Sequence, residues 1–140
     1  MSKSREKIIA EFTVEKDPPI IMLADKDYAA PTSIFLFSDE VLAAWKLYCD
    51  AHPYVKKHDC DDFAFEYKSF MQGLHAQSKF PEDGFAVGVV FYLVGNDPTK
   101  GHAICWALTE DRGLIYIEPQ TGLELVMSAT EVGSRFFVYG

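Results

Sequence analysis

The chain has 140 residues, with 13 lysines and arginines against 21 aspartates and glutamates, which gives a net charge of −8. This length predicts one domain spanning residues 1–140. The 49% of hydrophobic and 14% of aromatic residues exclude a disordered or coiled-coil chain. The acidic charge argues against nucleic-acid binding, which depends on clustered lysine and arginine. The longest apolar run, residues 85–94, is about half as long as a membrane-spanning helix, so no membrane segment is expected.

The first residues and the cysteines both favour a cytoplasmic location. The charged start, MSKSREK, lacks the apolar stretch and cleavage site of a signal peptide. The three cysteines, Cys49, Cys60 and Cys105, are too few for a disulfide framework. We therefore expect a cytoplasmic protein with reduced thiols.

The first half of the chain predicts one strand, one loop and the first helix. Residues 8–14 alternate as in a strand, and residues 25–33 have the composition of a loop. Ser38 is a predicted N-cap, since two acidic residues follow it at the start of a helix that His52-Pro53 ends. One face of this helix is apolar: Val41, Leu42, Trp45 and Tyr48.

A second helix is predicted from Asp59 to about Gln77, with an apolar stripe that includes Phe63, Tyr67 and Met71. After Pro81 the pattern changes to short β-rich runs separated by turn residues. The predicted strands are 85–94, 102–109, 114–118, 123–127 and 135–139. Helices followed by strands predict an α+β domain, in which N-terminal helices pack on a C-terminal antiparallel sheet.

Three residues could form a nucleophilic site. Cys60 opens the second helix, where the unpaired N–H groups and the helix dipole favour a thiolate. His102 begins one predicted strand and Glu118 ends the next, so antiparallel pairing of the two strands would bring them together. Cys60 would then be the nucleophile, His102 the base and Glu118 the residue that orients it. The alternative is that Cys60 is an inert packing residue.

The acidic residues around Cys60 indicate a bound cation. Asp59, Asp61 and Asp62 each disfavour a neighbouring thiolate, and a cation would remove this penalty. Glu118 and Gln120 could supply further oxygen ligands, and oxygen ligands favour Ca²⁺ or Mn²⁺. The alternative is a solvated helix start without an ion, and we expect no organic cofactor.

Three short motifs carry a family resemblance: residues 59–64 (DCDDFA), 101–103 (GHA) and 117–122 (IEPQTG). In order and separation they resemble the papain-like cysteine protease domain of Marasmius oreades agglutinin, with relatives in bacterial and phage proteins. The resemblance implies a papain-like core over roughly residues 28–140.

The resemblance implies catalytic roles for Cys60, His102 and Glu118, and a Ca²⁺ or Mn²⁺ site at Asp61, Asp62 and Gln120. Papain places a glutamine before its cysteine to stabilise the oxyanion. In this chain Tyr54 occupies that neighbourhood, so the oxyanion donors would be the Cys60 backbone N–H with Tyr54 or His58.

The leading functional prediction is a thiol-dependent amide hydrolase of the cysteine peptidase type, acting on a peptide or protein substrate through an acyl-enzyme. Transglutaminase-type acyl transfer would use the same residues with an amine in place of water. A different class remains open, a non-catalytic binding protein that retains the fold and holds a partner in its groove. A zinc site at His58, Cys60 and His102 is a further alternative.

Overall fold

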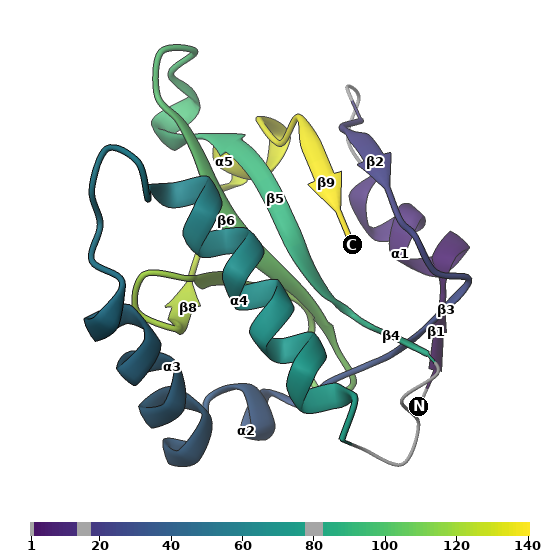
Figure 1. Cartoon of the computed structure of the whole chain (residues 1–140). Helices are drawn as coiled ribbons and strands as arrows, with labels where there is room; N and C mark the ends of the chain where they lie inside the picture. The colour runs from purple at the N-terminus through teal and green to yellow at the C-terminus, as the bar shows by residue number, and fades with distance from the viewer. Residues whose placement is uncertain (1, 14–17, 78–82) are drawn as a thin grey trace.

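The computed structural model describes residues 2–13, 18–77 and 83–140. Its main element is a six-stranded sheet with the strand order β2-β9-β5-β6-β7-β8. Helices cover both of its faces (Figure 1). The strands of this sheet are β2 (Ile20–Met22), β5 (Val87–Leu93), β6 (Gly101–Thr109), β7 (Gly113–Glu118), β8 (Leu123–Leu125) and β9 (Phe137–Tyr139).

The remaining elements are a small sheet and several helices. The small sheet has the order β1-β3-β4. Its strands are β1 (Ser2–Ser4), β3 (Asp27–Ala29) and β4 (Gly84–Phe85). The helices are α1 (Arg5–Phe12), α2 (Ser33–Leu36), α3 (Asp39–Ala51), α4 (Cys60–His75), the 3-10 turn η1 (Val94–Asn96) and α5 (Ala129–Gly133). Within the described residues, no helix is both long and apolar enough to cross a membrane.

The central strands follow the sequence prediction closely. β5, β6 and β7 form an antiparallel meander in which Val89 is paired with Cys105, and Cys105 with Ile117. The outer part of the sheet differs from the expected antiparallel arrangement, because β2 runs parallel to β9. Helices together with a mixed sheet confirm the predicted α+β class.

The predictions for the N-terminal segment were wrong in two places. Residues 5–12 form the helix α1 instead of a strand, since the Ser4 hydroxyl accepts a hydrogen bond from the Lys7 N–H at 3.2 Å and caps it. Ile8 and Phe12, one turn apart, are buried on one side of this helix. The predicted loop 25–33 contains β3, which pairs with β1 and β4. Val14 and Pro81, which the sequence assigns to a strand and a turn, lie outside the described residues.

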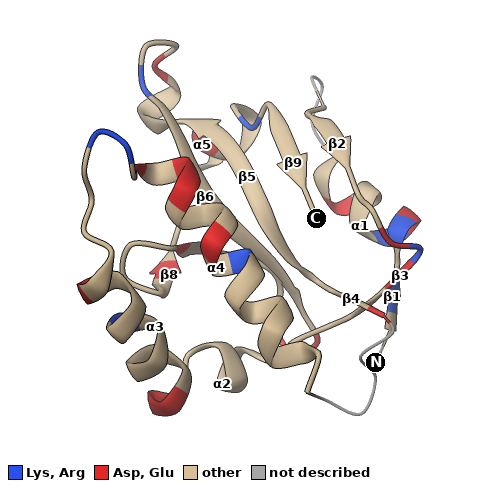
Figure 2. Ribbon diagram, in the orientation of Figure 1, with Lys and Arg blue, Asp and Glu red and all other residues tan. Residues whose placement is uncertain are grey.

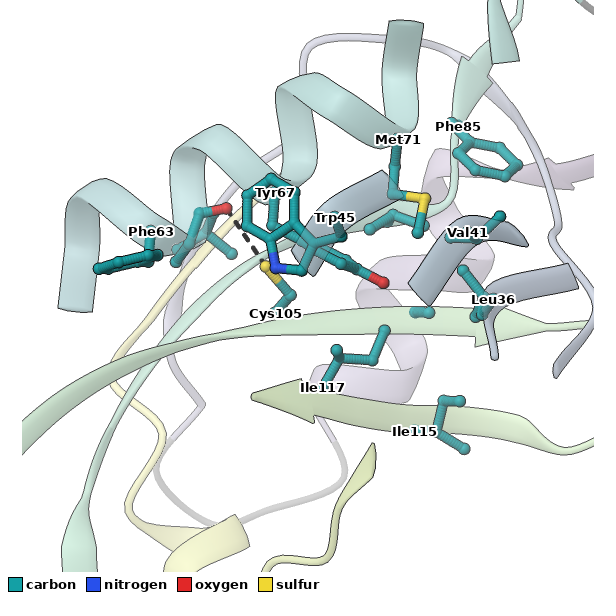
Figure 3. Close-up of a cluster of buried hydrophobic side chains, with 14 of the residues drawn as sticks. Leu36, Val41, Trp45, Phe63, Tyr67, Met71, Phe85, Cys105, Ile115 and Ile117 are labelled. Carbon is teal, nitrogen blue, oxygen red and sulfur yellow. Dashed lines mark hydrogen bonds between the residues drawn. The ribbon is translucent and has the colours of Figure 1, made fainter. Parts of the chain in front are cut away.

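Helices α3 and α4 pack on one face of the main sheet and form the larger core (Figure 3). Trp45 of α3 and Tyr67 of α4 are both buried, with ring centroids 5.1 Å apart in an edge-to-face arrangement. The Trp45 indole N–H donates to the Pro119 carbonyl at 2.6 Å, so α3 is fixed to the turn between β7 and β8. On the opposite face, α1 covers a second core that contains Trp106 and Tyr92.

The starts of α3 and α4 confirm the expected helix signals. The Ser38 hydroxyl accepts from the Val41 N–H at 3.3 Å. At the start of α4, the Asp59 backbone N–H donates to the Asp62 carboxylate at 3.1 Å. This bond positions the residues around Cys60.

Candidate functional site

The three segments expected to form the site meet at one end of the main sheet (Figure 1). β6 begins and β7 ends at this end, because the two strands are antiparallel. α4 packs on β6, since the Cys105 thiol donates to the Ala64 carbonyl at 3.2 Å, and it runs in the same direction as that strand. Farther along α4, Gln72 accepts from the Phe85 N–H at 3.2 Å, toward the other end of the sheet. Cys60, four residues before Ala64, therefore begins α4 at the same end as the start of β6.

His102 and Glu118 contact each other across the β6–β7 pair. The His102 Nε2 and Glu118 Oε2 atoms are 3.0 Å apart, and the two side chains are 21% and 20% exposed. They are diagonal neighbours in the ladder, because Cys105 is paired with Ile117. Glu118 Oε1 is buried and has no hydrogen-bond partner in the described structure. The carboxylate thus holds the imidazole with one oxygen, while the other is buried without a hydrogen bond among the described residues.

Cys60 is the third residue expected at the site. Its side chain is partly buried and packs against the core beneath α4. The ring of His102 contacts Tyr92, which belongs to the core on the other face of the sheet. Within the described residues, no hydrogen bond joins the Cys60 thiol to His102, so the structure pairs two of the three expected residues.

The other two cysteines pack in or against the larger core. Cys105 is fully buried, and this burial raises its pKa well above the usual range for a thiol. Burial also raises the pKa of Cys49. Both thiols are therefore held in the protonated, unreactive form.

A carboxylate cluster lies at the start of α4, where Figure 2 shows acidic residues in red. Oxygens of Asp59, Asp61 and Asp62 all lie within 4.8 Å of one another. A hydrogen bond with Asp61, followed by desolvation, raises the pKa of Asp59. A donor set made only of carboxylate oxygens fits Ca²⁺ or Mn²⁺, so the residues present fit the predicted cations.

Gln120, the third predicted metal ligand, lines a cavity beside α3. This cavity has a volume of about 400 Å³ and is bordered by α3 residues that include Leu42 and Lys46. In the part of the chain that the structure describes, the Gln120 side chain forms no hydrogen bond with Asp61 or Asp62. The structure thus joins two of the predicted ligands with Asp59.

The predicted oxyanion residues have other contacts. The Tyr54 ring lies parallel to the Phe63 ring at 6.2 Å and is 56% exposed. His58 Nε2 is 2.6 Å from Glu66 Oε2, and this hydrogen bond raises the pKa of His58. His58 is therefore engaged by Glu66.

The sequence analysis missed the role of Glu66. Burial, then a hydrogen bond with Glu66, raises the pKa of Tyr48 to about 12, so Glu66 links α3 to the segment before α4. A histidine just before a helix and a glutamate two turns into it were the available signal. The zinc alternative finds no support, because among the described residues His58, Cys60 and His102 are not a cluster with metal-ligand spacing.

The chain is similar to a known protein family and to known structures. The model of a family described as "Agglutinin C-terminal" matches residues 36–124. The structure titled "PSL1a-E64 complex" has a TM-score of 0.78 at 19% identity, covering 99% of this chain and 51% of that one. A structure of Polyporus squamosus lectin bound to the human-type influenza-binding epitope Neu5Aca2-6Galb1-4GlcNAc has a TM-score of 0.73 at 20% identity, covering 99% of this chain and 49% of that one.

At these identities the likeness establishes a shared fold, and the chain spans about half the length of the proteins it matches. No curated protein matches the chain.

These findings correct the functional prediction. The family is named for an agglutinin and one similar structure is a lectin, and both names denote carbohydrate-binding proteins. They contradict the predicted thiol hydrolase, its transglutaminase-type variant and its peptide or protein substrate. The family model covers more than half of the chain, and the chain therefore belongs to the agglutinin C-terminal family.

Proposed function

We propose that this chain is a non-catalytic binding domain that keeps a papain-like arrangement of its helix-start cysteine and strand-start histidine. The observation that carries the proposal is the His102–Glu118 pair, a hydrogen-bonded polar group at the exposed end of the sheet. A preformed pair of this kind can orient a ligand without chemistry, because Glu118 fixes the partly exposed imidazole of His102 as a hydrogen-bonding position.

The ligand class we propose is a glycan. The similar Polyporus squamosus structure holds a sialylated glycan, although this chain spans only about half of that protein. Tyr54 is 56% exposed, and the stacking of its ring on Phe63 in the first turn of α4 places it near the start of that helix. An exposed aromatic ring beside fixed polar groups suits a ligand with one apolar face and many hydroxyls.

The proposal includes a Ca²⁺ or Mn²⁺ ion held by Asp61 and Asp62, with Gln120 as a third ligand. The clustered carboxylate oxygens of Asp59, Asp61 and Asp62 support it. The ion would supply positive charge to this acidic end of the domain. Asp61 and Asp62 would hold it, while Asp62 also keeps its bond to the Asp59 N–H.

The test is a glycan titration by calorimetry, using Neu5Acα2-6Galβ1-4GlcNAc and lactose, each with Ca²⁺, Mn²⁺ or EDTA. We expect saturable binding that Tyr54→Ala and His102→Ala weaken and that Asp61→Asn makes independent of the ion. Lys100→Ala, an exposed change in the loop before β6, is the matched control. A thermal melt should show a higher Tm with Ca²⁺ or Mn²⁺, because ligands that bind only the folded state stabilise it.

Two results would contradict the proposal. An unchanged Tm in every ion would show that the aspartates form a solvated helix start. If an ion raises Tm but no glycan binds in its presence, the glycan part of the proposal is wrong and only the cation site is supported.

A further inference from the structure

One part of the main sheet has no helix over it on the α4 face. α4 covers β5 and β6, whereas β9 and β2 extend beyond it (Figure 1). Phe137 and Tyr139 of β9 lie on the same face as α4, because Val138 between them belongs to the core on the opposite face. Ile20 of β2 is paired with Phe137 and is 68% exposed. The sheet therefore presents an apolar strip beside α4.

Side chains on this strip form a cavity of about 310 Å³. It is lined by Ile20, Phe65, Phe91, Phe136 and Phe137. Phe91 contacts two of the other lining rings, since its ring centroid is 6.0 Å from that of Phe136 and 5.7 Å from that of Phe137. No polar or charged side chain lines it, so it favours a hydrocarbon group.

A second cavity adjoins the first at Phe65. It has a volume of about 280 Å³ and is lined by Phe65, Lys68, Ser69, Gln72 and Tyr139. The rings of Phe65 and Tyr139 are 5.4 Å apart, so one aromatic wall continues from the apolar cavity into the polar one.

Lys68 supplies a positive charge in the second cavity. It is the only lysine or arginine of α4 and is the blue segment of that helix in Figure 2. Its ammonium lies 5.8 Å from the centre of the Tyr139 ring. Asp25 is the acid that acts on it electrostatically, yet within the described residues no carboxylate lies within ion-pair distance of it. Burial lowers the pKa of Lys68, which an anionic partner would reverse.

Two further hydrogen-bond donors lie in the polar cavity. The Gln72 carbonyl oxygen accepts from the Phe85 N–H, and among the described residues no hydrogen bond engages its amide N–H₂, which can therefore donate to a ligand. Ser69 is exposed and contributes a hydroxyl. An ammonium, an amide and a hydroxyl together suit a carboxylate.

We propose that the two cavities form one binding site for a fatty acid, with its carboxylate at Lys68 and its alkyl chain over the phenylalanines. Charge complementarity selects this occupant, because a neutral hydrocarbon would leave the half-buried ammonium unpaired and an inorganic anion would leave the apolar cavity unfilled. Phe91 is paired with Ala103, next to His102, so the apolar cavity begins near the His102–Glu118 pair. The Lys68 cavity lies farther along α4, and a fatty acid is a different ligand from the proposed glycan.

The experiment is calorimetric titration of the whole chain with laurate below its micelle concentration. Lauryl alcohol and dodecyltrimethylammonium serve as ligands with the same tail but a neutral or positive head. We expect laurate to bind at least about ten-fold more tightly than the alcohol, the size of one charge-assisted hydrogen bond. Lys68→Met should abolish this preference, whereas Phe136→Ser should weaken both ligands. Lys100→Met is the matched control and should change neither.

Equal binding of laurate and lauryl alcohol by the natural chain would overturn the role of Lys68, and this comparison needs no variant. No binding of laurate would overturn the site. A dimer in sedimentation that Phe136→Ser converts to a monomer, with no laurate binding, would assign the apolar strip to a second copy of the chain.

Discussion

At the residue scale, the contact that most clearly sets a pH response is the one between His58 and Glu66. The two side chains are 18% and 36% exposed, so solvent screens their interaction in part. The hydrogen bond with Glu66 raises the pKa of His58, and Asp62 adds to the effect. A histidine with a raised pKa in the folded state stabilises the fold fully below its unfolded pKa of about 6.5. This contribution is lost as the pH rises through the higher, folded value.

We therefore predict that the stability lost on His58→Gln is larger at about pH 6 than at about pH 8. The measurement is urea unfolding of both proteins at the two pH values. His52→Gln is the matched control, because His52 is an exposed histidine that stacks on Tyr48. An equal loss at both pH values would show that the bond to Glu66 does not depend on protonation.

At the scale of elements, local sequence signals determined much of the fold. Ser38, Asp59 and the apolar faces of two helices predicted α3 and α4, since caps and periodicity act over neighbouring residues. β5, β6 and β7 were predictable because turn residues separate long apolar runs. α1 and β3 were not, because α1 is amphipathic over only two turns and β3 depends on pairing with distant strands.

Alanine substitutions at two glycines test how closely these elements pack. A Cβ atom at Gly88 of β5 would clash with the Tyr139 carbonyl and lie 2.5 Å from the Trp106 indole nitrogen. The Trp106 indole also donates to that carbonyl at 3.2 Å. We predict that Gly88→Ala lowers the free energy of unfolding by at least about 2 kcal/mol, because overpacking there separates β5 from β9.

Gly73→Ala is the matched control for this change. Gly73 lies in α4, and nothing comes within 4 Å of an added Cβ atom. The substitution should raise the free energy of unfolding by up to about 1 kcal/mol, the helix preference of alanine over glycine. Thermal or urea unfolding measures both variants. A tolerated Gly88→Ala would contradict the close approach of β5, β6 and β9.

At the scale of the whole molecule, the sequence predicted that two of the expected side chains meet, whereas its assignment of function was wrong. The positions of His102 and Glu118 followed from antiparallel pairing of two strands, and the structure places the two side chains 3.0 Å apart. Their relation to Cys60 could not be read from the sequence, because it depends on how α4 packs over the sheet. The sequence could also not distinguish a residue set that binds from one that reacts, since both need the same polar side chains.

The apolar strip and Lys68 show a second limit of prediction from the sequence. Phe65, Phe91 and Phe137 lie far apart in the sequence and have ordinary spacing for core residues. Only the position of β9 and β2 beyond α4 leaves them uncovered. A ligand site of this kind arises from tertiary packing and carries no local motif.

The central claim is that this domain binds without catalysis, and Cys60 is the residue that decides it. The most direct measurement incubates the chain with an unfolded protein substrate and with E64, the ligand named with PSL1a, in Ca²⁺, Mn²⁺ and EDTA. Cys60→Ala is the control, and mass spectrometry follows both substrate fragments and any adduct on Cys60. We predict that no fragments form and that Cys60 is modified no faster than an exposed free thiol. Substrate cleavage or rapid E64 labelling that disappears in Cys60→Ala would contradict it.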